Sequence, residues 1–211
     1  MLYNAYKYLF PPRPENALSP DSLVFYEKIL KWVFQFKKNG TNTVIFVSPE
    51  KEYTIKTRHK TDHKAWSMTD HIKKELTRLF PEKNWLVLSA ELLHSKTVEI
   101  KDTIYIHDIL VFNNELLIGS TFMQRQKILE DHLKTNVETY SHYVCDDQNK
   151  IWFAKLFFSN IEKLFYSIKD THIDEGLVGK NPAGKLNFCD TPTSNSGWSA
   201  KFRHTSKKYQ F

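Results

Sequence analysis

The amino-acid sequence predicts an α+β fold in which mainly antiparallel β-sheets are flanked by helices. Short runs rich in β-branched and aromatic residues alternate irregularly with segments of helical periodicity, which is typical of this class rather than of a regular βαβ array. The 211 residues suffice for one substantial core, and neither an internal repeat nor a change of composition divides them. We therefore expect one domain over residues 1–211.

The N-terminal residues predict an extended arm that leads into a short helix. Residues 1–18 are rich in Tyr and contain the run Pro11-Pro12-Arg13-Pro14, whose fixed φ angles and missing amide donors disfavour a helix. The triplet Ser19-Pro20-Asp21 has the form of an N-cap residue followed by Pro in the first helical turn. It predicts a short helix that ends at about Lys28.

The later elements are predicted from hydrophobic periodicity and from the residues that interrupt it. Thr69 to Phe80 carries apolar residues at helical spacing and is stopped by Pro81. Further helices are predicted over residues 122–133 and 160–168, and turns over 182–196. Strands are predicted at residues 32–36, 42–47, 53–57, 85–93, 103–112, 151–157, 176–180 and 198–203.

Composition excludes several classes of protein. Apolar residues make up 41% of the chain and aromatic residues 14%, which excludes a disordered chain. No apolar run reaches the roughly 20 residues of a membrane helix, and the N-terminus lacks the apolar core of a signal peptide, so we expect a cytoplasmic protein. Cys145 and Cys189 are too few for a disulfide framework. His59, His63 and His71 lack the spacing of a zinc site.

The charge of the chain favours a polyanionic partner. The formal net charge is +6, a modest excess that is consistent with nucleic-acid binding. The last eleven residues carry Lys201, Arg203, Lys207 and Lys208 and no acid. We therefore expect residues 204–211 to form a basic tail.

Lys37 stands beside the strongest turn signal of the sequence. Asn39-Gly40 between two β-rich runs is typical of a two-residue β-hairpin. Two interpretations stay open from these residues alone. The segment is a plain hairpin, or it is a hairpin that presents Lys37 as a nucleophile toward an α-phosphorus. In the second case, Lys38 or a bound metal would lower the pKa of Lys37.

Two apolar strands contain acidic groups. Glu91 lies within Leu88 to Leu93, where a buried carboxylate needs a partner, unless it faces solvent at the end of the strand. His107 and Asp108 interrupt the run from Tyr105 to Phe112, and an edge strand that satisfies both through its backbone is the simpler interpretation.

Two further segments near the C-terminus combine charge with β-rich sequence. In Asp174-Glu175-Gly176, followed by Lys180, the acids suit a metal and the lysine suits a phosphate, although a plain turn into a strand explains them too. Alternation places Lys201 and Arg203 on one face of a strand, where they could grip one phosphate or merely face solvent.

The order of these segments resembles the covalent nucleotidyltransferase superfamily, which contains ATP-dependent DNA ligases, RNA ligases and mRNA capping enzymes. The resemblance runs from about Pro11 to Phe211 and is strongest to the small ligases of bacteriophages, which consist of little beyond the adenylation domain. Their PPRP-type start, K-x-N-G-T motif and K-x-Y-x-F ending match Pro11 to Pro14, Lys37 to Thr41 and Lys207 to Phe211.

The resemblance implies a role for each candidate residue. Lys37 would be the nucleophile that forms lysyl-AMP, and Lys201 and Arg203 would stabilise charge on the α-phosphate. Glu91 and Glu175 would hold the divalent cation, Mg²⁺ or Mn²⁺, partly through water, with Glu91 in contact with a metal-bound water or with the ribose. The remaining contacts to ATP would come from Gln35 and Phe36 at the adenine, His107 stacked on it, Asn42, Lys180 at the phosphates, and Arg58, which would also contact a nucleic-acid 5′-phosphate.

The implied activity is that of an ATP-dependent DNA ligase. Acting as a monomer, it would seal 5′-phosphate/3′-hydroxyl nicks and could accept RNA or mixed junctions. Asn39 replaces the aspartate of KxDG, and Asn42 replaces a common arginine in a way that resembles one branch of RNA ligases, so an RNA ligase is the main alternative. A capping guanylyltransferase and a non-catalytic nucleic-acid-binding protein are the others. We expect no oligonucleotide-binding-fold domain, which in the family carries the motif that orients the pyrophosphate. Either the first step proceeds without that motif, or the N-terminal arm and the C-terminal tail compensate for it.

Overall fold

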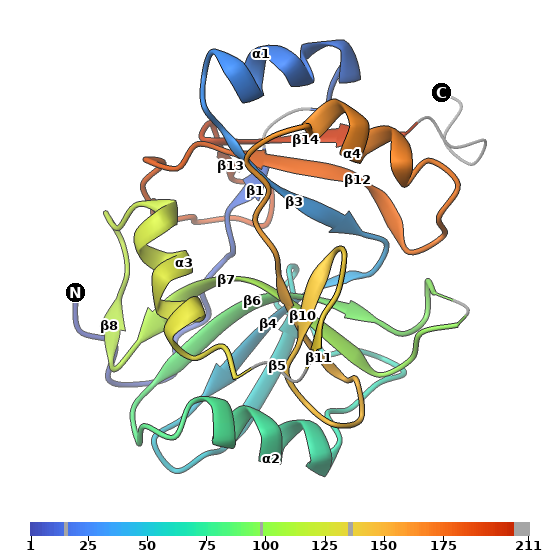
Figure 1. Ribbon diagram of the computed structural model, residues 1–211. Coiled ribbons are helices and arrows are strands. Elements are labelled where there is room, and N and C mark those ends of the chain that lie inside the picture. The colour runs from blue at the N-terminus through green and yellow to red at the C-terminus, as the bar shows by residue number, and fades with distance from the viewer. Residues whose placement is uncertain (15–16, 98, 135–136, 205–211) are drawn as a thin grey trace.

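Two β-sheets lie one above the other, with helices on their outer faces (Figure 1). This computed structural model describes residues 1–14, 17–97, 99–134 and 137–204. The larger sheet has eight strands in the order β5-β4-β6-β7-β11-β10-β9, with β8 paired to β7. The smaller sheet has four strands in the order β2-β14-β12-β3. The predicted α+β class is confirmed.

The larger sheet is antiparallel except where β11 runs parallel to β7. The predicted strands in the first half of the chain are found within a few residues of their expected bounds. The strands of this sheet are β4 (Thr41–Val47), β5 (Tyr53–Thr57), β6 (Leu86–Leu93), β7 (Thr103–Phe112), β8 (Glu115–Leu116), β9 (Val137–Glu138), β10 (His142–Val144) and β11 (Ile151–Ala154).

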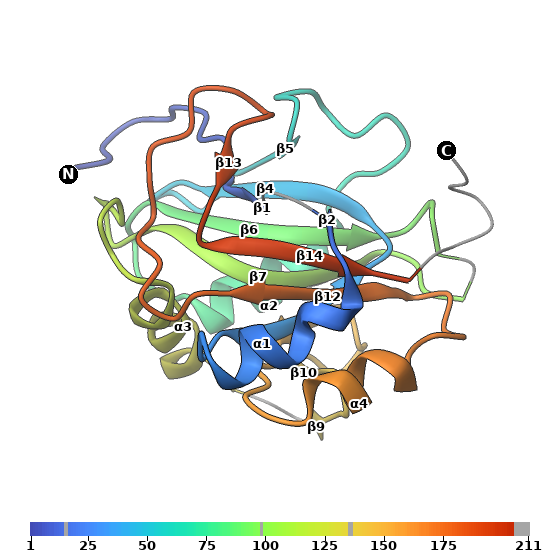
Figure 2. The ribbon, with the colours of Figure 1, turned by 90° about the horizontal axis from the view of Figure 1, so that it is seen from above.

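The smaller sheet brings together segments from both ends of the chain. Its strands are β2 (Ala17–Leu18), β3 (Val33–Lys38), β12 (Asp174–Lys180) and β14 (Ser199–Arg203). A separate parallel pair joins β1 (Arg13–Pro14) to β13 (Asn195–Ser196). Seen from above, β12 and β14 lie over β6 and β7 of the larger sheet (Figure 2).

The helices cover the outer faces and one side of the two sheets. A 3₁₀ turn (Pro20–Ser22), capped by Ser19 as predicted, leads into α1 (Leu23–Lys28), which lies with α4 (Ile161–Ser167) on the smaller sheet. Helix α2 (Asp70–Leu79) covers the larger sheet, and α3 (Phe122–Asp131) lies at the side. None of the described helices is both long and apolar enough to cross a membrane.

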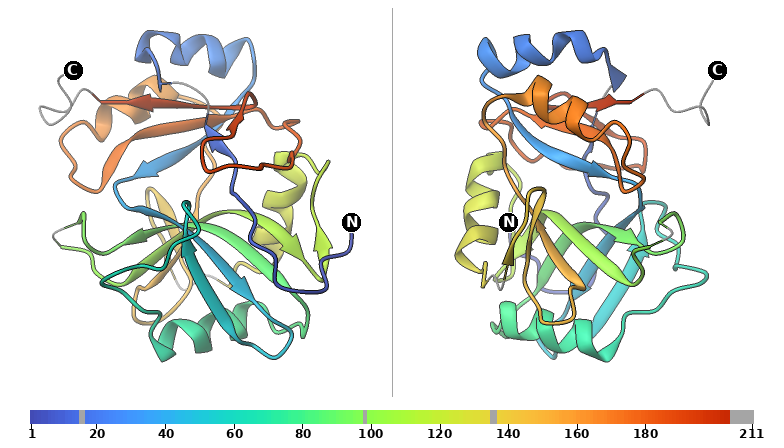
Figure 3. Two further views of the ribbon diagram at one scale, coloured as in Figure 1. Left: turned by 180° about the vertical axis from the view of Figure 1, so that it is seen from behind. Right: turned by 45° about the vertical axis from the view of Figure 1, so that its right-hand side comes forward.

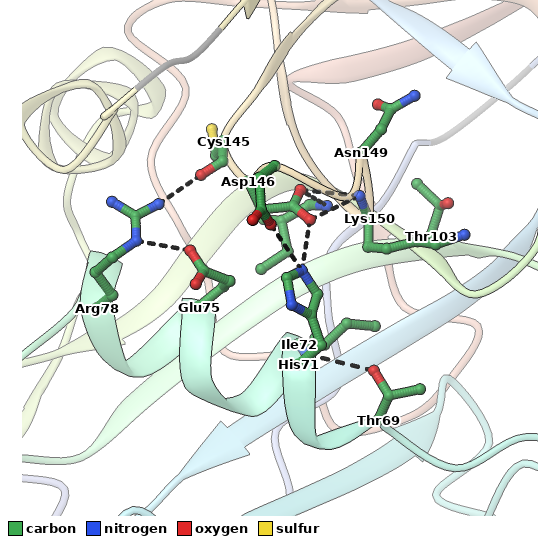
Figure 4. Close-up of polar contacts among 12 residues, drawn as sticks. Thr69, His71, Ile72, Glu75, Arg78, Thr103, Cys145, Asp146, Asn149 and Lys150 are labelled. Atoms are coloured by element: carbon green, nitrogen blue, oxygen red, sulfur yellow. Dashed lines mark hydrogen bonds and ion pairs between the residues drawn. The ribbon is translucent and has the colours of Figure 1, made fainter.

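Polar contacts join helix α2 to the hairpin of β10 and β11 (Figure 4). His71 Nε2 lies 2.8 Å from Asp146 Oδ2, and Arg78 donates to the Cys145 carbonyl at 2.6 Å. The Asp146 carboxylate also accepts from the Lys150 and Ile151 amides. Although His71, Asp146 and Asp147 bring ligand atoms within 4.8 Å of one another, Asp146 is already engaged as the anchor of this turn.

The predicted hairpin at Asn39-Gly40 is wrong. Strand β3 pairs with β12 and β4 pairs with β5 and β6, so the chain crosses here from the smaller sheet to the larger one. A Cβ on Gly40 would lie 2.6 Å from both Glu91 Cγ and the Leu92 carbonyl oxygen. The glycine therefore permits a close approach to β6 instead of forming a tight turn.

The described part of the N-terminal arm connects the two sheets (Figure 3). Tyr3 and Tyr8 are buried in the core of the larger sheet, and the Tyr8 hydroxyl donates to the Thr57 carbonyl at 2.7 Å. Further along, β2 pairs with β14 of the smaller sheet. The basic tail with Lys207, Lys208 and Phe211 lies outside the described residues, except for His204 at its start.

Candidate active site

A pocket of about 380 Å³ opens where the two sheets face each other. This volume is in the range of small-molecule sites. Its lining contains every site residue predicted from the sequence: Gln35, Phe36, Lys37, Asn42, Arg58, Glu91, His107, Glu175, Lys180, Lys201 and Arg203. Residues separated by most of the chain therefore meet in one cavity.

Lys37 projects from β3 beside Glu175. Its amine forms an ion pair with Glu175 Oε2, and Arg203 Nη2 lies 3.4 Å from the same oxygen. The pairing register passes from Asp174 opposite Lys38 to Gly176 opposite Lys37, so Glu175 is the extra residue of a β-bulge. A bulge redirects a side chain at a sheet edge, which here aims the carboxylate at the amine.

The alternation of β3 separates its side chains into two sets. Gln35, Phe36 and Lys37 all line the pocket, and the Phe36 ring also packs in the core of the smaller sheet, with its centroid 5.2 Å from that of Phe157. Lys38 Nζ lies 2.8 Å from Asp174 Oδ1 in a buried position. The charge of Lys38 is therefore already paired with Asp174, and its action on the amine of Lys37 stays a prediction.

One end of the pocket is built around His107 and Lys180. The Lys180 amine donates to Gln35 Oε1 at 2.7 Å and to the His107 carbonyl at 3.3 Å. Burial lowers the pKa of Lys180 to about 8. Burial, reinforced by the charge of Lys180, lowers the pKa of His107 to about 3. The imidazole is thus neutral near pH 7 and is one of the aromatic side chains that line the pocket.

Cations gather at the other end. Burial lowers the pKa of Lys201 to about 8, and the charges of Arg13, Arg203, Lys37 and Arg58 lower it further. Burial also lowers the pKa of Arg58, whose buried Nε has no hydrogen-bond partner among the residues that the structure describes. Unpaired buried donors are rare, so this end is suited to bind an anion. Lys180 lines the same pocket but is not among the groups whose charges act on Lys201, and its predicted contact with the phosphates stays a prediction.

Two carboxylates in the pocket fit a divalent cation. Burial raises the pKa of Glu91, against the charges of Lys37, Lys96 and Arg58, and the charge of Glu175 raises it further. Asn42 pairs opposite Glu91 across β4 and β6, and its Oδ1 is buried without a partner within the described part of the chain. Carboxylate and amide oxygens are ligands that Mg²⁺ and Mn²⁺ accept.

This chain is similar to known proteins in its fold. No protein-family model and no curated protein sequence matches this chain. Among solved structures, mycobacterial DNA ligase D complexed with ATP and MES is similar, with a TM-score of 0.63 and 15% identity over 92% of this chain and 60% of that one. The ATP-dependent DNA ligase of bacteriophage T7, in complex with ATP, is similar with a TM-score of 0.61 and 13% identity, over 92% of this chain and 68% of that one. The chain has the fold of an ATP-dependent ligase nucleotidyltransferase domain.

The same nucleotidyltransferase fold occurs in ligases of different kinds. An archaeal ATP-dependent RNA ligase has a TM-score of 0.51 and 17% identity, over 92% of this chain and 48% of that chain. The chain thus spans about 60% of the length of the mycobacterial ligase D structure and about half that of the RNA ligase. At these identities the similarity concerns the fold.

The sequence did not single out two residues near this pocket. Arg125 of α3 is fully buried and binds Asp108 through Nε–Oδ1 at 2.8 Å and Nη2–Oδ2 at 3.0 Å. Burial alone would raise the pKa of Asp108, but this pair holds it below its usual value. A signal for Arg125 exists, since it shares the helical spacing of the buried Phe122 and Leu129. Arg13 was seen only as part of the proline-rich arm.

Proposed function

We propose that this chain is an ATP-dependent polynucleotide ligase that acts through a lysyl-AMP intermediate on Lys37. The observation that carries the proposal is the position of Lys37. Its amine enters the pocket where the chain crosses between the sheets, beside Glu175 and near the cations around Lys201. The likeness of the fold to that of ATP-dependent ligases supports it.

The pocket provides what the first transfer needs. Lys37 Nζ attacks the α-phosphorus of ATP, an N–P bond forms, the bond to the bridging oxygen breaks, and pyrophosphate leaves with the electron pair. Glu175, in contact with the amine, can accept a proton from it. Lys201 and Arg203 neutralise charge on the phosphate, because such transfers depend on positioning and electrostatics.

The two ends of the pocket suggest how ATP is oriented. The neutral ring of His107 would stack on the adenine, with Gln35 and Lys180 beside it. The phosphates would then lie at the cationic end near Arg58 and Lys201. Glu91 and Glu175, with Asn42 close by, would hold Mg²⁺ or Mn²⁺, which supplies charge neutralisation when bound.

The second and third steps would join polynucleotide ends. AMP passes from Lys37 to a 5′-phosphate, for which Arg58 is the proposed contact, and a 3′-hydroxyl then attacks that phosphate and releases AMP. We place nicked duplex DNA first. RNA ends are the second candidate because Asn39 and Asn42 match an RNA-ligase pattern, and an RNA ligase has the same fold.

Intact-protein mass after incubation with Mg²⁺ and a nucleotide tests the first step. We expect ATP to add one AMP, and Lys37→Ala to form no adduct. Lys73→Ala is the matched control, since Lys73 pairs with Asp70 on the surface of α2. An adduct formed only with GTP would indicate a capping-type transferase. No adduct with ATP, GTP or NAD at any pH from about 6 to 9, the range around neutrality in which catalytic acids and bases operate, would leave only nucleic-acid binding.

Sealing assays on the protein that forms the adduct test the polynucleotide substrate. Nicked duplexes with DNA, RNA or one strand of each separate the candidates. We expect the all-DNA nick to be sealed. Sealing of RNA ends alone would make the chain an RNA ligase, and no sealing of any substrate would limit it to AMP transfer.

A further inference from the structure

Lys38 is a buried cation that the proposed chemistry does not use. Its side chain is 1% exposed, and its partner Asp174 is 9% exposed. Lysine is rarely buried to this extent without a paired charge, because removing an ammonium from water is energetically unfavourable. Burial lowers the pKa of Lys38 and raises the pKa of Asp174, and the charge of each group opposes the pKa shift of the other. Each group therefore depends on the other to remain charged.

The Lys38 ammonium contacts both sheets at the point where the chain crosses between them. It lies 2.8 Å from Asp174 Oδ1 in the smaller sheet and donates at 3.2 Å to Ser141 Oγ, next to β10 of the larger sheet. The rings of Phe36, Tyr105 and Trp152 surround it, with centroids at 5.3, 5.4 and 5.6 Å. Cation–π attraction adds to the ion pair in such a desolvated place.

This arrangement adjoins the pocket, whose lining includes Lys38 and Tyr105. Two ion pairs join β3 to β12 through neighbouring residues, Lys38 with Asp174 and Lys37 with Glu175. Glu175 is the bulge residue, so the backbone on either side of it sets its direction. On one side lies Asp174, which Lys38 holds in place.

A second contact fixes the backbone on the β3 side. The hydroxyl of the buried Tyr105, one of the rings around Lys38, donates to the Phe36 carbonyl at 3.3 Å. The residue directly before Lys37 is thereby tied to β7 of the larger sheet. The backbones of the nucleophile and of its carboxylate partner are thus both held by one cluster, which consists of Lys38, Asp174, Ser141, Tyr105 and Trp152.

We propose that Lys38 is a positioning residue for AMP transfer, which pairs with Asp174 next to the bulge and so keeps Glu175 and Lys37 in the geometry for attack. The proposal rests on the proposed function. Without Lys38, the Asp174 carboxylate would be buried unpaired, and it would have to take up a proton or turn toward water. Either change alters the backbone next to Glu175.

The test compares stability with the rate of a single AMP transfer at saturating ATP. Lys38→Met should lower both the Tm and the rate, the rate by about tenfold or more, since small misplacements are costly. The ATP concentration for half-saturation should change less than about twofold, because ground-state binding is retained. Lys38→Met combined with Asp174→Leu removes both charges and should restore the Tm but not the rate. Asp174→Asn replaces Asp174→Leu if the latter misfolds.

A stability control separates positioning from folding. Leu79→Ala truncates a buried side chain of α2, far from the pocket, and should lower the Tm while leaving the rate unchanged well below it. The proposal is overturned if Lys38→Met keeps the wild-type rate, or if the double variant regains the rate together with the Tm. If the wild-type protein itself forms no adduct, the proposed function has failed and this role fails with it.

Discussion

Glu175 occupies a β-bulge opposite Lys37, and its carboxylate forms an ion pair with the Lys37 amine. The same carboxylate oxygen lies 3.4 Å from Arg203 Nη2. One acid from β12 thus links the proposed nucleophile to a cation of β14. The bulge is the backbone feature that makes this meeting possible, because regular pairing would carry the side chain past Lys37.

Glu175→Gln should slow AMP transfer without unfolding the protein. The amide keeps the shape but loses the charge, so it can neither accept a proton nor hold a divalent cation well. Because the pair is partly exposed, we expect the free energy of unfolding to change by less than about 1 kcal/mol. The rate of AMP transfer should fall by about 100-fold, as for removal of one preorganised electrostatic group.

Rate and urea unfolding of the same preparations check this expectation. Glu162→Gln is a suitable control, since this exposed glutamate lies in α4 on the outer face. A Glu175→Gln protein that transfers AMP at the wild-type rate would contradict the role of the carboxylate.

Gly176→Ala should disrupt the bulge by steric overlap. Gly176 has φ of 142°, and a Cβ there would lie 2.0 Å from the Phe202 carbonyl oxygen. We expect a loss of about 3 kcal/mol or more in the free energy of unfolding, measured by urea titration. At Gly119, φ is 85° and a Cβ meets nothing within 4 Å among the described residues, so Gly119→Ala isolates the backbone strain at about 1–2 kcal/mol. Equal losses at the two glycines would argue against the overlap.

The sequence predicted most elements because periodicity records which side of an element is buried. The apolar positions of α2, for example, are those that the structure buries, and Thr69 and Ser19 cap their helices. Periodicity does not record which element covers a face. The Asn39-Gly40 signal therefore predicted a hairpin, although β3 and β4 find their partners in different sheets.

The candidate residues were predicted from their order along the chain, and their grouping in one pocket depends on the fold. Other contacts between distant elements have no corresponding motif order in the sequence, so they were not predicted. Arg125 meets Asp108 across 17 residues, and Lys38 meets Asp174 from another part of the chain altogether. Because Lys38 directly follows the proposed nucleophile, the sequence suggested that it acts on the Lys37 amine. Side chains alternate along a strand, however, and the two lysines pair with different acids, Lys37 with Glu175 and Lys38 with Asp174.

His107 should make the protein sensitive to acid. Its pKa is lowered to about 3 in the folded protein, from an ordinary value of 6.5. Because the unfolded chain binds the proton first, stability falls as the pH drops from 6.5 toward 3 and is fully present above 6.5. His107→Phe removes this titrating group. The loss in the free energy of unfolding between pH 7.5 and 5 should therefore be smaller than in the wild-type protein by up to about 2 kcal/mol.

Urea titrations at the two pH values provide the measurement. The exposed His59, at the rim of the pocket, is the matched control, and His59→Phe should leave the loss unchanged. If His107→Phe loses as much stability as the wild-type protein, then the ring is not buried in its neutral form.

Arg13 should contribute to catalysis from the N-terminal arm. Its charge helps to lower the pKa of both Lys201 and Arg58, its neighbours Pro12 and Pro14 line the pocket, and β1 pairs with β13 to hold this part of the arm in place. Arg13→Ala should slow AMP transfer by about tenfold, the scale of one charge-assisted contact to phosphate, and Arg13→Lys should retain most of the rate. Lys7→Ala removes another cation of the same arm, which lies over the Phe188 ring, and should have no effect. If Arg13→Ala and Lys7→Ala behaved alike, the arm would act only by packing, through Tyr3 and Tyr8.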